Sequence, residues 1–286
     1  MTLDWRLRIS LIAGLIVVAA FIVLPAIQAI LLSFEGTDSF VVPATWVGLA
    51  NFERVLVMPE FWRDLGTGLT YAIVTVCLQL VLGTIFALIL NVPLKGQALF
   101  RGVAILPYVV PTVVVAISFQ WMLDGNIGLI TQIVRNLGLG RLIWSDDPWI
   151  ALMTVTLISV WMWTPFVTTC VLAGLQTIPD NLYAAARVDG AGPWSRFWHV
   201  TFPGLRSVLI VVIIMRGIWM FNKFDIIWLM TRGGPLGATE HLPILSYSMA
   251  FRQYDIGGGA AVATLSFLIL SAFVALFIHL FPLQEK

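Results

Sequence analysis

The chain has 286 residues, of which 59% are hydrophobic and 11% are charged, and its formal net charge is +1. Soluble domains carry about a quarter of their residues as charged side chains, so this composition excludes an ordinary soluble protein and indicates a chain that lies in a lipid bilayer. A net charge this small, without a basic stripe, also argues against nucleic acid as a partner.

Six apolar segments are long enough to cross a bilayer as α-helices. They cover about residues 9–34, 66–91, 103–123, 149–172, 207–230 and 256–281. Alternating strand patterns are absent, which predicts an all-α membrane protein. We therefore expect a six-helix transmembrane bundle that forms one domain over residues 1–286.

Basic residues before the first apolar segment raise the question of a secretory signal. The apolar run is too long for one and no convincing small-residue cleavage site follows it, so we expect a permanent helix. The short loop with Lys95 and Arg101 lies on the more basic side of the spans, which predicts that both termini are cytoplasmic. That side holds Arg6, Arg8, Lys95, Arg101, Arg187, Arg196, Arg206 and Lys286, and the other holds Arg54, Arg63, Arg135, Arg141, Arg232 and Arg252.

Three predicted spans contain a proline, namely Pro25, Pro111 and Pro165. Proline removes a backbone donor, which membrane helices tolerate only where neighbours or cavity water satisfy the freed carbonyl. These prolines mark candidate bends around a pathway, and kinks set by packing alone are the alternative.

Several chemistries have no support in the sequence. Cys77 and Cys170 fall inside predicted spans, and the three histidines are scattered, so neither a disulfide nor a metal site is expected. No phosphate-binding loop of the form G-x-x-x-x-G-K-[ST] occurs. We expect no catalytic residue and no cofactor in this chain. If ATP drives the protein, another chain binds it.

The fifth span contains three charged side chains, Arg216, Lys223 and Asp225. Charge inside a membrane helix indicates function. At about 100° per residue, Arg216 and Lys223 project from nearly the same face, with Trp219 and Met220 between them, whereas Asp225 points away and would bond another helix. Two unpaired cations predict an offsetting anion, which is a carboxylate of another helix or the solute itself. The alternative places Lys223 and Asp225 at the outer end, in contact with water.

The polar segment after the fourth span begins at Ile178 and reads as two short helices joined by a sharp turn. Pro179 suits a first helical turn, residues 184–186 are alanines, and Gly190 permits a reversal. This pattern resembles the EAA loop of ABC importer permeases, although the family's usual glutamate is Ala184 here. An ordinary helical hairpin on the membrane surface is the alternative.

The resemblance implies a coupling loop over residues 173–206 whose short helix docks on an ATP-binding subunit. The residues that it places at this contact are Tyr183, Ala184, Ala185, Ala186, Asp189 and Gly190.

Further motifs resemble carbohydrate-uptake permeases of the maltose type. They include Trp163-Thr164-Pro165-Phe166 in the fourth span and Thr231-Arg232-Gly233-Gly234-Pro235 after the fifth, the latter similar to the first permease of the pair. The resemblance implies a bacterial inner membrane protein with a homologous second permease, two ATP-binding subunits that hold ATP and Mg, and an extracytoplasmic solute-binding protein. Its expected solute-binding residues are Ser159, Trp161, Trp163, Phe166, Arg216, Trp219, Met220 and Lys223.

Aromatic faces at such a site would stack on the C–H face of a pyranose ring, while polar groups read the hydroxyls. A place in the aromatic belt is the alternative for Trp161 and Trp163. The sequence thus predicts the permease subunit of an ATP-driven importer of a sugar or sugar derivative, neutral or anionic, that works by alternating access. The alternatives are ABC uptake of a polyol, glycerol phosphate or another small solute, and an ion-coupled secondary transporter, which should have inverted repeats.

Overall fold

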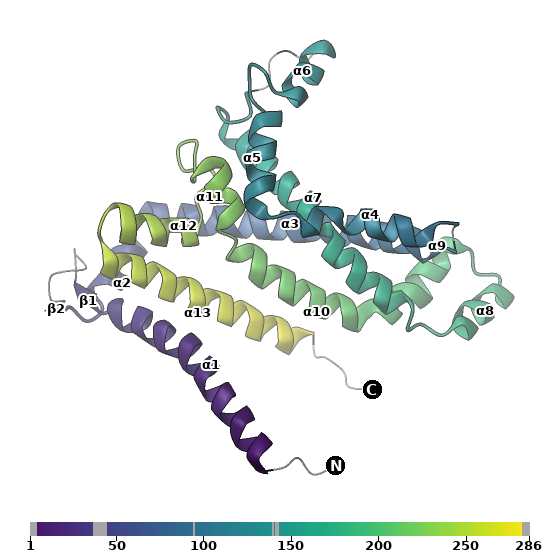
Figure 1. The fold of residues 1–286 in the computed structure, drawn as a ribbon, viewed down its shortest axis with the longest axis horizontal. Coiled ribbons are helices and arrows are strands. Elements are labelled where there is room, and N and C mark those ends of the chain that lie inside the picture. The colour runs from purple at the N-terminus through teal and green to yellow at the C-terminus, as the bar shows by residue number, and fades with distance from the viewer. Residues whose placement is uncertain (1–4, 37–44, 94, 139, 141–142, 282–286) are drawn as a thin grey trace. The chain divides into compact units, whose positions relative to one another are not determined.

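The computed structural model describes residues 5–36, 45–93, 95–138, 140 and 143–281, without the side chains of residues 5–10, 13 and 15. Four of the basic residues on which the predicted orientation depends are affected: Arg141 and Lys286 lie outside the described residues, as do the side chains of Arg6 and Arg8. Helices dominate (Figure 1), and the strands in the described part are one antiparallel pair of two residues each. The prediction of an all-α membrane protein is confirmed.

Helices, short strands and π-helical turns alternate along the described residues. They are α1 (Trp5–Leu32), β1 (Glu35–Gly36), β2 (Thr45–Trp46), α2 (Ala50–Val57), α3 (Pro59–Asn91), α4 (Gln97–Val109), α5 (Thr112–Met122), α6 (Leu129–Asn136), α7 (Pro148–Leu175), α8 (Asp180–Val188), α9 (Pro193–Arg196), the π-helical turn η1 (Phe197–Thr201), α10 (Phe202–Phe221), α11 (Asp225–Thr231), α12 (Leu242–Tyr247), the π-helical turn η2 (Ser248–Arg252) and α13 (Ile256–Leu280).

Four helical runs in the described part are long and apolar enough to cross a membrane, and α4 with α5 forms a fifth candidate. The four runs are Pro59–Asn91, Pro148–Leu175, Pro193–Thr231 and Ile256–Leu280. In α1 the apolar stretch with described side chains is Ile16–Leu32, which is shorter. A sixth crossing by α1 therefore stays a prediction.

The third predicted span is wrong as a single helix. Residues 103–123 belong to two helices, α4 and α5, which meet at an angle of 88°. Val110 and Pro111 lie at the break with extended backbone, because a residue before proline is driven out of the helical region. Of the three candidate bends, Pro111 marks a break, whereas Pro25 and Pro165 lie within the continuous helices α1 and α7.

The fifth predicted span is also interrupted. Helix α10 ends at Phe221 and α11 begins at Asp225, so residues 222–224 are not helical. The Asn222 amide donates a hydrogen bond of 3.1 Å to the carbonyl of Ile218, four residues back. Asparagine competes for backbone groups in this way and favours helix ends.

The chain divides into two compact units, Met1–Arg63 with Leu242–Ile269 and Asp64–His241 with Leu270–Lys286. In the first, Arg54 and Asp255 form an ion pair of 2.7 Å. In the second, α3, α7 and α10 pack closely around a fully buried core that includes Val167 and Leu205. Small residues allow this approach, since a Cβ at Gly83 would lie 2.7 Å from Cγ1 of Val167. The single domain remains a prediction.

Candidate functional site

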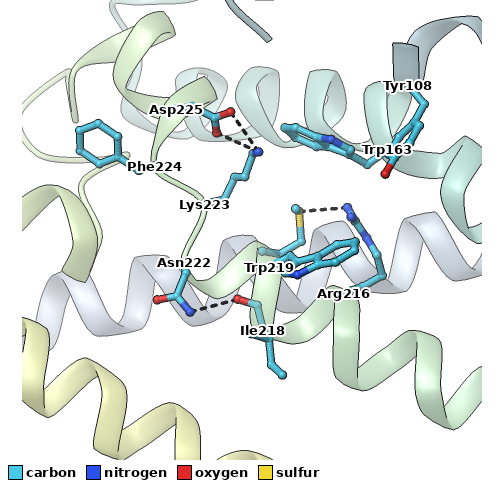
Figure 2. A pocket seen from close by; sticks show the side chains of 10 residues that line it. Tyr108, Trp163, Arg216, Ile218, Trp219, Asn222, Lys223, Phe224 and Asp225 are labelled. Carbon is cyan, nitrogen blue, oxygen red and sulfur yellow. Dashed lines mark hydrogen bonds and ion pairs between the residues drawn. The ribbon is translucent and has the colours of Figure 1, made fainter. Parts of the chain in front are cut away.

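The break between α10 and α11 opens a pocket of about 520 Å³ in the second unit (Figure 2). Tyr108 reaches it from α4 and Trp163 from α7, and the end of α10, the break and the start of α11 supply the rest. The complete lining is Tyr108, Trp163, Arg216, Ile218, Trp219, Met220, Asn222, Lys223, Phe224 and Asp225. Aromatic faces and polar groups therefore meet at one place.

Arg216 is a buried cation at this pocket, 1% exposed. Its Nε donates a hydrogen bond of 2.9 Å to Oε1 of Gln79, and its Nη2 lies 3.5 Å from Sδ of Met220. Its guanidinium carbon lies 5.6 Å from the ring centroid of Trp219, 5.8 Å from that of Phe166 and 5.9 Å from that of Trp163. Within the described part of the chain, no carboxylate pairs with it. Neutral acceptors and aromatic faces stabilise the charge.

A second layer of hydrogen bonds orients Gln79. Its Nε2 donates a hydrogen bond of 3.1 Å to the backbone carbonyl of Ser159. This bond orients the amide group so that its oxygen faces Arg216. The Ser159 hydroxyl is in turn 2.7 Å from the hydroxyl of Tyr71. Gln79 and Ser159 are fully buried and Tyr71 is almost so. Ser159, expected to contact solute, does not line the pocket and instead supports it from behind.

Lys223 lies at the pocket with an acidic partner. Its Nζ is 2.9 Å from Oδ1 of Asp225 and 4.0 Å from the ring centroid of Trp163 (Figure 2). The prediction that Asp225 points away and bonds another helix is wrong, because α10 ends at Phe221 and helical periodicity does not extend to Asp225. The expectation of two unpaired cations is likewise wrong for Lys223 and holds only for Arg216.

Five of the eight predicted solute-binding residues line this pocket: Trp163, Arg216, Trp219, Met220 and Lys223. Phe166 does not line the pocket, and its ring lies 5.2 Å from that of Trp219. Trp161 lies outside the pocket, half-exposed, with its ring 5.4 Å from that of Phe119.

Sequence reasoning missed several lining residues and the supporting Gln79. Asn222 and Asp225 had a signal, because polar residues interrupting an apolar span indicate function. Tyr108 had no such signal in the sequence, since its position at the pocket depends on where α4 packs. The described residues contain no group of three or more histidine, cysteine, aspartate or glutamate side chains able to hold a metal ion.

In the predicted coupling loop only α8 is a separate short helix, whereas α9 continues through η1 into α10, so the prediction of two short helices is wrong for the second. Gly190 adopts a φ of +77° at the turn between α8 and α9, a value that favours glycine. Pro179 precedes α8 as its capping residue rather than lying in the first turn. No residue of α8 is buried, so Ala184 and Ala185 are free to meet a partner. Tyr183 ties α8 to η1 through a 3.0 Å hydrogen bond between its hydroxyl and that of Thr201.

Comparison with known proteins agrees with these features. A family model described as "Binding-protein-dependent transport system inner membrane component" matches residues 79–282. The chain is 38% identical over 264 residues to the trehalose/maltose transport system permease protein MalF of Thermococcus litoralis, covering 92% of this chain and 89% of that relative. It is 30% identical over 284 residues to the sulfoquinovosyl glycerol transport system permease protein SmoG of Agrobacterium fabrum, and this match covers 99% of this chain and 92% of that relative.

Among solved structures, the chain is similar to a bacterial ABC transporter involved in the import of the acidic polysaccharide alginate. The TM-score is 0.86 at 20% sequence identity, and the match covers 99% of this chain and 97% of that chain. At this identity the likeness shows a common fold. The extent of the family match and of the identity to MalF shows that the chain belongs to the binding-protein-dependent transport system inner membrane components, as a multi-pass permease of an ABC importer.

Proposed function

We propose that the solute of this permease is a sugar or sugar derivative and that it binds in the pocket beside Trp163. The observation that carries the proposal is the Lys223–Asp225 ion pair next to the Trp163 ring, with Lys223 Nζ 4.0 Å from its centroid. A pyranose ring offers an apolar face to an indole and hydroxyls to a neighbouring donor and acceptor. The relatives named for trehalose/maltose and sulfoquinovosyl glycerol support the same class of solute.

The charge of the lining favours a second candidate, an acidic sugar. Arg216 and Lys223 contribute two positive charges and Asp225 one negative charge, so the lining carries a net charge of +1. Arg216 has neutral hydrogen-bond partners, and a guanidinium binds a carboxylate, sulfonate or phosphate in a forked geometry. A neutral sugar would use the same group as a hydroxyl donor. Family membership excludes the ion-coupled secondary transporter, while a polyol or glycerol phosphate remains an alternative.

The assembly that we propose contains a homologous second permease, two ATP-binding subunits that hold ATP and Mg, and an extracytoplasmic solute-binding protein. Both termini would be cytoplasmic, and α8 would dock on an ATP-binding subunit with Tyr183, Ala184, Ala185, Ala186, Asp189 and Gly190 at the contact. The exposure of α8 supports this placement. Hydrolysis on the partner subunits would shift the permease pair between inward-facing and outward-facing states.

The test is uptake by the whole complex in proteoliposomes with its solute-binding protein. Maltose, trehalose, sulfoquinovosyl glycerol and glycerol 3-phosphate are compared. We expect a sugar to be transported, and Trp163→Ala to weaken its uptake by about 2- to 10-fold, because aromatic contacts are worth about 0.5–1.5 kcal/mol beyond area burial. The matched control is Trp161→Ala, which removes an indole outside the pocket.

Equal effects of the two tryptophan variants, or transport of glycerol 3-phosphate alone, contradict the proposal. The charge of the solute is decided by which of these compounds is transported, and Arg216→Met tests the role of the guanidinium. If the solute is acidic, its uptake collapses in this variant while assembly and basal hydrolysis survive. Transport restricted to neutral sugars excludes the acidic candidate.

A further inference from the structure

Four aromatic side chains form a cluster in the second half of the predicted coupling loop, from α9 to the start of α10. Trp194, Phe197, Trp198 and Phe202, which we call the aromatic cluster, pack with ring centroids 5.2 to 6.4 Å apart. Trp194 is nevertheless 73% exposed, Trp198 45% and Phe202 43%. Three large rings exposed side by side make an apolar patch that water does not favour.

The helical run that contains the cluster is longer than a bilayer requires. Its unbroken part runs from Pro193 through α9, η1 and α10 to Phe221, which at 1.5 Å per residue corresponds to about 44 Å against a hydrocarbon core of about 30 Å. The 20 residues of α10, which begins at Phe202, correspond to about 30 Å by themselves, and Trp198 precedes Phe202 by four residues, about 6 Å. A hydrocarbon core filled by α10 would therefore have the cluster at its edge, at the level of the lipid headgroups.

The side chains have the chemistry of that layer. Tryptophan is enriched at membrane–water interfaces, where its ring contacts acyl chains and its N–H meets polar groups. Among the described residues, neither the Trp194 nor the Trp198 indole N–H has a hydrogen-bond partner, and Arg196 and Arg206 form no ion pair. Each arginine near an anionic leaflet contributes about 1 kcal/mol of attraction.

The proposed ATPase contact occupies a different surface. It lies on α8, where Val188 is 88% exposed, across the Gly190 turn from the cluster. Figure 1 shows α8 as a short helix separate from α9, which continues through η1 into α10. The hydrogen bond between Tyr183 and Thr201 joins the two surfaces.

We propose that the aromatic cluster, with Arg196 and Arg206, binds the headgroup layer of an anionic phospholipid leaflet. The rings lie among the upper acyl carbons and the guanidinium groups contact phosphates. Through the Tyr183 hydroxyl, this anchor holds the base of α8 at a fixed depth, so that force from a docked ATPase moves α10 rather than a loose loop. The inference rests on the coupling role of α8 and not on the identity of the solute.

The test places a fluorophore at single cysteines in a chain whose Cys77 and Cys170 are replaced. The full chain with its partner subunits is reconstituted in nanodiscs of phosphatidylcholine and phosphatidylglycerol. Trp198→Cys carries the label, Trp194→Cys is a second site in case the first does not fold, and Val188→Cys on α8 is the control. Each label is quenched separately by iodide from water and by a nitroxide lipid, with and without the ATP-binding subunits.

We expect the nitroxide lipid to quench the label at position 198 whether or not the ATP-binding subunits are bound. Iodide quenching there should be at least about threefold weaker than at position 188 without these subunits, since a leaflet at about −30 mV depletes anions by that factor. The proposal is overturned if iodide quenches the label at position 198 strongly and this quenching disappears only when the ATP-binding subunits bind. That result assigns the cluster to the contact with the ATPase. Protection from both quenchers also overturns it, because another protein surface then covers the cluster.

Discussion

Replacing Gln79 by leucine removes the acceptor that holds the buried guanidinium of Arg216. Gln79 Oε1 lies 2.9 Å from Nε of Arg216, and both side chains are almost completely buried. Leucine has a similar volume but no acceptor, so the cation loses a charge-assisted hydrogen bond that water does not readily replace. Nε2 of Gln79 also donates to the Ser159 carbonyl, and this bond is lost as well.

The size of the effect distinguishes a charge-assisted bond from an ordinary one. A neutral hydrogen bond between membrane helices is worth about 0.6 kcal/mol on average, whereas a bond to a charged group is worth about 1.5–3 kcal/mol. We therefore expect Gln79→Leu to lower the free energy of unfolding by at least about 1.5 kcal/mol. Reversible unfolding in mixed SDS and detergent micelles, followed by tryptophan fluorescence, measures this change.

Thr75→Val is the matched control. Thr75 lies on the same helix, α3, is also fully buried, and its hydroxyl has no hydrogen-bond partner. Valine keeps the shape and removes a buried hydroxyl that bonds to nothing, which is neutral or stabilising. Equal destabilisation by Gln79→Leu and Thr75→Val would refute the reasoning, because the loss would then reflect repacking of α3 rather than the bond to Arg216.

Three further predictions concern the rest of the chain. For the orientation, cysteines at Ser145 and Ser195 in a cysteine-free background are treated with an impermeant thiol reagent on intact cells, and only position 145 should react; labelling at 195 contradicts the proposed topology. For the coupling turn, Gly190→Leu strains a residue at φ +77° by about 1–2 kcal/mol and should reduce solute-stimulated ATP hydrolysis, whereas Gly192→Leu, at φ −69°, adds the same bulk without that strain. For the pH dependence, burial lowers the pKa of His241 to about 4 in the folded chain. Below about pH 6.5 the unfolded chain therefore binds more protons than the folded chain, and the free energy of unfolding should decrease as the pH falls from about 6.5 to about 4. A His241→Gln variant with the same pH dependence as the unmodified protein would contradict this.

Much of the architecture was predictable because its causes are local in sequence. Apolar runs of bilayer length indicate membrane helices, since a single continuous segment satisfies its own backbone groups in lipid only as a helix. The turn at Gly190 was also predictable, because a proline, an alanine run and a glycine act within a few residues of one another. Five of the eight predicted solute-binding residues line the pocket for a similar reason, as charged and aromatic side chains within apolar spans are conspicuous.

Only the tertiary structure decided how these residues are used. Ser159 and Trp163 lie one helical turn apart on α7, yet one bonds Tyr71 behind the pocket and the other contacts Lys223 inside it. One regular helix through residues 207–230 would place the side chains of Lys223 and Asp225 on different faces. Because α10 ends at Phe221, the two side chains instead meet as an ion pair. By itself, the sequence determined that most of the chain forms apolar helices and where the turn at Gly190 lies, because hydropathy and turn chemistry are properties of neighbouring residues. The pocket depends on where helices break and which faces pack, and these result from contacts between residues far apart in the chain.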